Sequence, residues 1–257
     1  MSTSVFDDVR FRARLNELSS ASDLRWFVAL SIGLLLTLVA AYVTPNDGNF
    51  WAYAGLLLRA SVYITAAERL PDRGGVIITR LFALGVVAGL FELLVDYGLV
   101  HWVSSGRLVY LTGADIVLLA SPVWMPLAWA CVIVELGYPG LRLLSILSRT
   151  MPTMRAAVIA TVVAASSAAV TVGFYEFFAF RAGWWRYEPA HVMLGSACAA
   201  FVPLGEGLMF LALPWIAARS ISEAETLPRA AAVSGGARFA GAIAVGYALA
   251  YAALEMR

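Results

Sequence analysis

The chain has 257 residues, of which 61% are hydrophobic and 14% are charged, with a mean hydropathy of +0.80. Soluble domains carry about 25% charged residues, so this composition excludes an ordinary soluble domain and indicates an integral membrane protein. The formal net charge of +1 points to no class of charged partner, and nucleic acid is not expected to bind.

The N-terminal segment differs from the rest of the chain. Its first 24 residues are too polar and too acidic for a signal peptide, and no small-residue cleavage site follows them. We expect residues 1–24 to form a cytoplasmic polar head. Residues 25–257 are expected to form one transmembrane domain, because no linker or low-complexity tract divides them.

Apolar runs dominate the remaining sequence. A helix needs about 20 apolar residues to cross a hydrocarbon core of ~30 Å, and seven runs approach this length with short polar breaks between them. We therefore predict an all-α integral membrane protein with seven transmembrane helices. The approximate spans are 26–43, 50–68, 80–100, 116–136, 156–180, 191–217 and 236–254.

Every basic residue is an arginine, which excludes a retinal-type Schiff base because that chemistry needs a lysine amine. The arginines cluster before the first span and in alternate loops, so the clusters share one side. The positive-inside rule then predicts that the N-terminus is cytoplasmic and the C-terminus outside the inner (cell) membrane. The clusters fall in residues 10–25, 69–80, 142–155 and 219–238.

Residues 85–136 and 169–215 carry the same series of motifs, which predicts an internal repeat. Each copy has an aromatic residue followed by Glu, then Gly-x-x-x-Tyr in a loop, then a Pro in the returning helix. The matched motifs are Phe91-Glu92 with Tyr175-Glu176, Gly106 to Tyr110 with Gly183 to Tyr187, and Pro126 with Pro203. Three residues after this Pro stands Trp129 in one copy and Glu206 in the other. Both copies run in one direction, so we expect parallel helical hairpins plus a closing helix.

We select four acids within the predicted spans as candidates: Glu92, Asp96, Glu176 and Glu206. A charge at a helix centre costs roughly 2.5 to 3.5 kcal/mol on insertion scales, so each should face the bundle interior. Small residues on the same helix faces allow close approach, and we expect the four carboxyl groups to converge on one site. Arg59, near the middle of the second span, is expected to pair with one of them. An acid without such a partner would stay neutral, as a general acid must.

Structural roles are the alternatives for these acids. Glu92 and Asp96 could be solvated or could link helices near the outer interface. Glu176 could make a structural hydrogen bond to the loop at Trp184 and Trp185. Glu206 has apolar sequence on both sides, which favours a functional role there.

The remaining candidate ligands show no metal pattern. Cys131 and Cys198 fall in separate spans, and no His pair or Cys-x-x-Cys spacing accompanies them. His101 and His191 each lie at a helix end, where an interfacial position is expected. We predict no metal site and no disulfide framework.

The motif Gly183-Trp-Trp-Arg-Tyr187 followed by Pro203-Leu-Gly-Glu206 resembles the membrane-embedded heterodimeric-type lycopene cyclases, whose hallmark is Pro-x-Glu-Glu. The first copy, with Glu92, Gly106 to Tyr110 and Pro122 to Trp129, resembles the carotenoid hydratases of the bacterioruberin pathway. The general plan is also similar to that of membrane-bound terpene cyclases. The resemblance covers roughly residues 85–215.

This resemblance implies that Glu206 is the proton donor and that Glu92 and Glu176 are its partner acid or base. Gly205 stands where the first Glu of the hallmark pair would be. A second acid would therefore have to come from Glu92, Asp96 or Glu176.

The sequence thus predicts an enzyme that protonates a double bond or epoxide of an isoprenoid or carotenoid-like substrate. Cyclisation, isomerisation and hydration all remain open as outcomes. Aromatic faces stabilise cations, so Trp129, Trp184 and Trp185 are predicted to bind the substrate, together with Tyr110, Tyr187 and Arg59.

No cofactor is expected, because the sequence has no glycine-rich phosphate loop. The expected partners are a hydrophobic small molecule from the bilayer and membrane lipids. Two alternatives have no catalysis: a proton-coupled transporter or lipid-binding membrane protein, and a structural factor whose buried charges fix the helix register.

Overall fold

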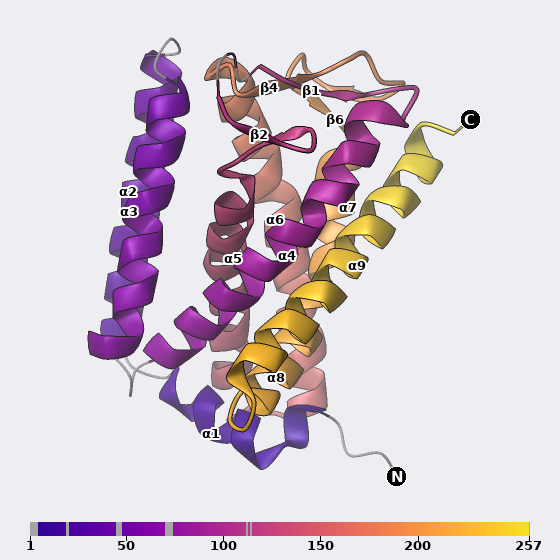
Figure 1. Cartoon of the computed structure of the whole chain (residues 1–257). Helices are drawn as coiled ribbons and strands as arrows, with labels where there is room; N and C mark the ends of the chain where they lie inside the picture. The colour runs from indigo at the N-terminus through magenta and orange to yellow at the C-terminus, as the bar shows by residue number, and fades with distance from the viewer. Residues whose placement is uncertain are drawn as a thin grey trace.

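The computed structural model describes residues 5–18, 21–44, 48–69, 74–111, 113 and 115–256. In this part of the chain a helical bundle is capped at one end by short β-strands (Figure 1). The N-terminal segment lies at the opposite end of the bundle from the cap and the C-terminus. The all-α prediction is therefore right for the bundle and wrong for the cap.

Ten helical elements make up the bundle in the described residues. They are η1 (Val5–Asp7), α1 (Val9–Glu17), α2 (Ala21–Val43), α3 (Gly48–Arg69), α4 (Gly75–His101), α5 (Met125–Leu147), α6 (Thr153–Arg181), α7 (Phe201–Phe210), α8 (Leu213–Glu223) and α9 (Pro228–Leu254). Helix α4 packs against α3, α5 and α9, while α7 packs against α6 and α9.

Several of these helices can cross a membrane. By length and composition α4, α5, α6 and α9 qualify, and α7 with α8 would add a fifth as one span bent by 41°. The apolar part of α2, Val28–Val43, is shorter than this criterion requires. The chain is therefore an integral membrane protein, and four to five of the seven predicted spans meet the criterion in the described residues.

Two predicted spans begin too early. Residues 116–136 were expected to be helical, but α5 begins at Met125 and continues to Leu147; residues 191–217 were expected to form one helix, but α7 begins at Phe201. The apolar residues before each helix form a hairpin instead, and hydropathy alone does not separate a short apolar strand from a helix. Pro126 in the first turn of α5 fits a helix start, since its missing N–H would have no partner there.

The cap consists of three two-stranded antiparallel sheets in the described residues. The pairs are β1 (Leu108–Tyr110) with β4 (Trp185–Tyr187), β2 (Val117–Leu118) with β3 (Ser121–Pro122), and β5 (Met193–Leu194) with β6 (Cys198–Ala199). Helix, strand, hairpin and helix follow in the same order from α4 to α5 and from α6 to α7.

The pairing of β1 with β4 is symmetric about its centre. Val109 pairs with Arg186, and each is the fourth residue of its own Gly-x-x-x-Tyr motif. Gly106 and Gly183 open the two motifs with φ of +63° and +69°, a left-handed conformation that favours glycine. A two-fold relation between the two stretches would produce this register.

Glycines on α4 set its distance from α5. A Cβ atom on Gly85 would lie 2.6 Å from the Cα of Ala130, and one on Gly89 would lie 2.6 Å from the Cα of Pro126. Side chains larger than hydrogen would push the helices apart. The acid-bearing half of α4 is thereby held against the start of α5.

The described part of the polar head, residues 5–18, packs under the bundle against α8. Phe6 and Phe11 are fully buried there. Arg14 Nε and Arg80 Nη1 both donate to Glu225 Oε1, at 2.9 and 2.6 Å. Residues 1–4, 19 and 20 of the predicted head lie outside the described residues.

Candidate functional site

A cavity of about 140 Å³ lies within the bundle, with walls from α2 to α7, α9 and the strands β1 and β4. All ten side chains that were predicted to be catalytic or to bind substrate line it. They are Glu92, Asp96, Glu176, Glu206, Trp129, Trp184, Trp185, Tyr110, Tyr187 and Arg59. The predicted convergence of the four intramembrane acids is confirmed, whereas the role of each residue stays a prediction.

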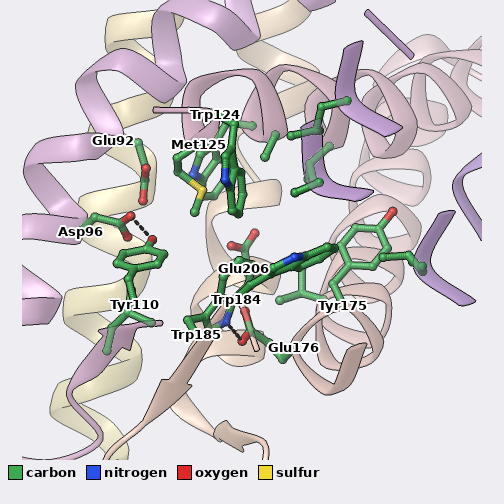
Figure 2. A pocket seen from close by; sticks show the side chains of 18 of the residues that line it. Glu92, Asp96, Tyr110, Trp124, Met125, Tyr175, Glu176, Trp184, Trp185 and Glu206 are labelled. Carbon is green, nitrogen blue, oxygen red and sulfur yellow. Dashed lines mark hydrogen bonds between the residues drawn. The ribbon is translucent and has the colours of Figure 1, made fainter. Parts of the chain in front are cut away.

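Asp96 is tied to the cap. Its Oδ2 atom accepts a hydrogen bond from the Tyr110 hydroxyl group in β1 (Figure 2). The same atom accepts a second hydrogen bond, of 2.7 Å, from Ser121 Oγ in β3. Asp96 is 4% exposed, so these hydroxyl groups take the place of water. The two hydrogen bonds therefore hold the Asp96 carboxyl group against the cap.

Glu92 lies one helical turn before Asp96 and is 1% exposed. Its Oε2 atom is buried and has no hydrogen-bond partner among the described residues. Glu92 and Asp96 are four residues apart on α4, so both carboxyl groups lie on the same face of this helix.

Glu176 is held by the cap. Its Oε2 atom accepts a hydrogen bond of 2.6 Å from Trp185 Nε1, and Figure 2 shows this contact below Trp184. The bond to the loop at Trp184 and Trp185 that was considered for this acid is present, while its role stays a prediction. Glu176 therefore fixes the position of an indole ring in the cavity wall.

Glu206 comes from α7 and is 4% exposed. Its Oε1 atom accepts a hydrogen bond of 2.8 Å from the Tyr247 hydroxyl group in α9, while its buried Oε2 atom has no partner in the described part of the chain. Figure 2 shows this carboxyl group in the space bordered by Trp124 and Trp184. Glu206 is thus an acid that is oriented by one bond and free at its other oxygen.

Gly205 explains the single acid at this point of α7. A Cβ atom there would lie 2.6 Å from Cδ1 of Tyr247. A Glu at position 205 would therefore displace the tyrosine that orients Glu206. The close packing of α7 on α9 thus requires a glycine where the Pro-x-Glu-Glu motif has its first Glu.

The expectation that Arg59 pairs with one of the four acids is wrong. Its Nη1 atom is 2.7 Å from Oε1 of Glu135, a residue of α5 that the sequence analysis missed. Tyr63 donates to Glu135 Oε1 at 2.9 Å, and Tyr175 donates to Oε2 at 3.1 Å. Glu135 was placed at the end of a predicted span, but α5 continues to Leu147 and puts it inside the helix.

Indole rings form the wall beside Glu206. Ring centroids are 6.0 Å apart for Trp124 and Trp184, 6.1 Å for Trp124 and Trp185, and 6.0 Å for Trp184 and Trp185. A cation within about 6 Å of such ring faces is attracted by their quadrupoles. Trp124 belongs to the quoted first-copy motif but was not selected from the sequence.

No group of three or more His, Cys, Asp or Glu side chains is placed to hold a metal ion within the described residues. Cys131 and Cys198 are buried, free thiols. Asp96, Glu176 and Glu206 are instead partnered by hydroxyl and indole groups, an arrangement suited to holding and moving protons.

A family model described as a domain of unknown function (DUF6989) matches residues 93–254. The matched region runs from the second half of α4 through α9 and contains Asp96, Glu176 and Glu206. Comparison with curated proteins and with solved structures gives no match. Because the matched region exceeds half of the chain, the protein belongs to the DUF6989 family.

Proposed function

We propose that this protein is a membrane enzyme that protonates a carbon–carbon double bond or an epoxide of an isoprenoid or carotenoid-like lipid. The observation that carries the proposal is Glu206, a buried acid with a free Oε2 atom in an aromatic cavity. A neutral carboxylic acid beside indole faces combines a proton donor with a surface that stabilises the resulting cation.

With an epoxide, the Glu206 proton goes to the oxygen atom, and the C–O bond breaks to leave a hydroxyl group and a carbon cation. With a double bond, the reaction begins with transfer of the Glu206 proton to one of its carbons. The π electron pair forms the new C–H bond, the other carbon becomes cationic, and Glu206 becomes a carboxylate. The rings of Trp124, Trp184 and Trp185 surround the cation. The three centroids lie about 6 Å from one another, so a cation placed among them would be within reach of all three rings.

The cation then has three fates. Attack by a second double bond closes a ring, and loss of a proton from the adjacent carbon completes cyclisation; proton loss alone gives an isomer. Addition of water followed by loss of its proton gives an alcohol. In each case a carboxylate accepts a proton, and Glu206 and the Glu92–Asp96 pair are the candidate acceptors.

The size of the cavity bears on the substrate. An engineered apolar cavity of about 150 Å³ holds one benzene molecule, and this cavity is about 140 Å³. It therefore suits one end of a long isoprenoid chain. Leu34 and Leu38 of α2 and Leu56 of α3 also line it, which supports entry of the chain from the side of the α2–α3 hairpin.

The proposal includes seven membrane spans in the inner membrane, with the N-terminus cytoplasmic. The arginine distribution supports this orientation. The end of the bundle that carries α1 would then face the cytoplasm, and the strand cap would face outside.

Product analysis in living cells tests the proposal. The native protein, Glu206→Gln and the control Glu188→Gln are expressed at equal membrane abundance in bacteria that accumulate linear carotenoids or prenylated epoxides. Glu188 is an exposed cap residue paired with Arg107, so its variant receives the same chemical change away from the cavity. Lipid extracts are then analysed by chromatography with mass detection.

A product of unchanged mass indicates cyclisation or isomerisation, and one heavier by a water molecule indicates hydration. We expect it with the native protein and Glu188→Gln, and not with Glu206→Gln. Absence of any product across a broad substrate panel, with folded protein in the membrane, would argue against the enzyme. Proton-coupled substrate movement in vesicles would then support the transporter.

A further inference from the structure

Arg59 introduces a cation into the wall of an otherwise acidic and aromatic cavity. It lies in the interior of α3, its side chain is 11% exposed, and it lines the cavity. Its Nε atom donates to the Gly55 carbonyl oxygen at 3.2 Å, and its Nη1 atom donates to Glu135 at 2.7 Å. Neither Gly55 nor Glu135 lines the cavity, so the guanidinium group is held by partners that lie behind the cavity wall.

A guanidinium group has five N–H donors in a rigid fork. The bonds to Gly55 and Glu135 use two of them, and no acceptor for Nη2 is found among the described residues. Nη2 is not among the fully buried side-chain atoms without a partner, so it is open to the cavity that Arg59 lines. A ligand oxygen in the cavity can therefore accept a hydrogen bond from this charged donor, and such bonds are stronger than neutral ones.

The charge of Arg59 is already balanced. Glu135 faces it in an ion pair and is itself held by the hydroxyl groups of Tyr63 and Tyr175. The other acids of the cavity are Glu92, Asp96, Glu176 and Glu206. A second anion beside this set would be repelled, whereas a neutral oxygen acceptor would not.

We infer that the cavity binds a prenyl lipid that carries a neutral oxygen group, a carbonyl or hydroxyl, which accepts a hydrogen bond from Arg59. The inference rests on the proposed function and narrows its substrate class to isoprenoids that carry a carbonyl or hydroxyl group. The oxygen group sits at Arg59 and anchors the ligand, so that a double bond of the attached chain lies at Glu206.

A binding experiment with three probes tests this inference without requiring turnover. The probes are geranylacetone, the hydrocarbon in which a methylene group replaces its carbonyl group, and geranyl phosphate. Binding to the full chain in lipid nanodiscs is followed by the fluorescence of the cavity tryptophans. Each apparent Kd is corrected for partition of the probe into empty nanodiscs.

Two variants separate the role of Arg59 from folding. Arg59→Gln/Glu135→Gln removes both charges together, so no unpaired charge is left in the bundle. Arg59→Lys keeps an ion pair with Glu135 but loses the planar fork of donors. Circular dichroism and size-exclusion chromatography check that each variant is folded. If the double variant does not fold, the result with Arg59→Lys alone tests the inference.

The native protein should bind geranylacetone at least about tenfold more tightly than the hydrocarbon, as expected for one hydrogen bond from a charged donor. It should also prefer geranylacetone to geranyl phosphate. The ketone preference should fall to about twofold or less in both variants and persist in Glu206→Gln. Equal binding of ketone and hydrocarbon, tighter binding of the phosphate, or an undiminished preference in a folded Arg59 variant would overturn the inference.

The two proposals can fail separately. Conversion of hydrocarbon polyenes by a protein without ketone preference would refute the oxygen anchor and leave the acid chemistry standing. A ketone preference that depends on Arg59, in a protein that converts no substrate, would leave the binding site standing and refute the enzyme.

Discussion

Tyr247 in α9 donates a hydrogen bond of 2.8 Å to Oε1 of Glu206 in α7, and the other carboxyl oxygen of Glu206 is left free in the described structure. This contact joins two helices and also fixes the direction of the candidate acid. Glu206 can rotate little, because α7 packs against α9 at this level and Gly205 lies against the Tyr247 ring.

Tyr247→Phe removes this hydrogen bond and keeps the ring. We expect the rate of product formation to fall roughly tenfold, because Glu206 loses the donor that orients it. The unfolding free energy should fall by about 1 kcal/mol. Tyr251→Phe, one turn later and outside the cavity lining, is the matched control and should keep the native rate. An unchanged rate in Tyr247→Phe would show that the contact serves packing alone.

Breaking the Arg59–Glu135 ion pair should lower the free energy of unfolding. Glu135→Ala leaves the guanidinium group buried without its counterion, for which a loss of about 3 to 5 kcal/mol is expected. Arg59→Met/Glu135→Leu removes both charges and should stay within about 1 kcal/mol of the native protein or exceed it. Thermal unfolding in detergent measures both variants. Equal destabilisation by the single and double changes would contradict this account of the pair.

Gly205→Glu should not create a better enzyme, although it restores Pro-x-Glu-Glu. The added side chain meets Tyr247, where even a Cβ atom would lie at 2.6 Å. We expect a loss of about 1 to 3 kcal/mol of stability from overpacking and a strong loss of product. Gly241→Ala on α9 has open space around its new Cβ atom and serves as the control. A stable, more active Gly205→Glu protein would refute this reading of the motif.

The end of the bundle that carries α1 should be sensitive to acid. The side-chain hydrogen bonds from Arg14 and Arg80 lower the pKa of Glu225, which follows α8, to about 2. An unfolded Glu has a pKa of about 4.3. The stabilisation by Glu225 is therefore complete above this value and is lost as the pH falls through the range from about 4 to 2.

Glu225→Gln should remove that part of the acid dependence. Limited proteolysis of the α1 segment at pH 6 and pH 3 measures it, with Glu188→Gln as the matched control. The native protein and the control should become more susceptible at pH 3, and Glu225→Gln should already be susceptible at pH 6. Equal resistance of Glu225→Gln and the native protein at pH 6 would contradict the role given to the contacts of Glu225 with Arg14 and Arg80.

The convergence of Glu92, Asp96, Glu176 and Glu206 could be predicted because an acid inside a membrane span is too costly to face lipid. The same reasoning should have selected Glu135. It failed there because the predicted span ended at residue 136, and hydropathy does not reveal where an apolar strand gives way to a helix.

Other members of the site left no comparable signal. Tyr247 and Ser121 carry neutral hydroxyl groups, which cost less to bury than a charge, so their contacts with Glu206 and Asp96 emerge only from the packed structure. The strand cap was missed because of the length of its strands. Its strands have two or three residues each, too few for alternation to show.

Transfer of a solvent-derived proton to substrate is the central claim, and deuterium incorporation tests it most directly. Membranes with the native protein or Glu206→Gln are incubated in D2O with the isoprenoid that the cell-based screen identifies, and products are analysed by mass spectrometry. We expect the native product to gain one deuterium at the protonated carbon, while Glu206→Gln yields no labelled product. Unlabelled product from the native protein with a substrate that has double bonds and no epoxide, or labelling at the native rate by Glu206→Gln, would contradict the account.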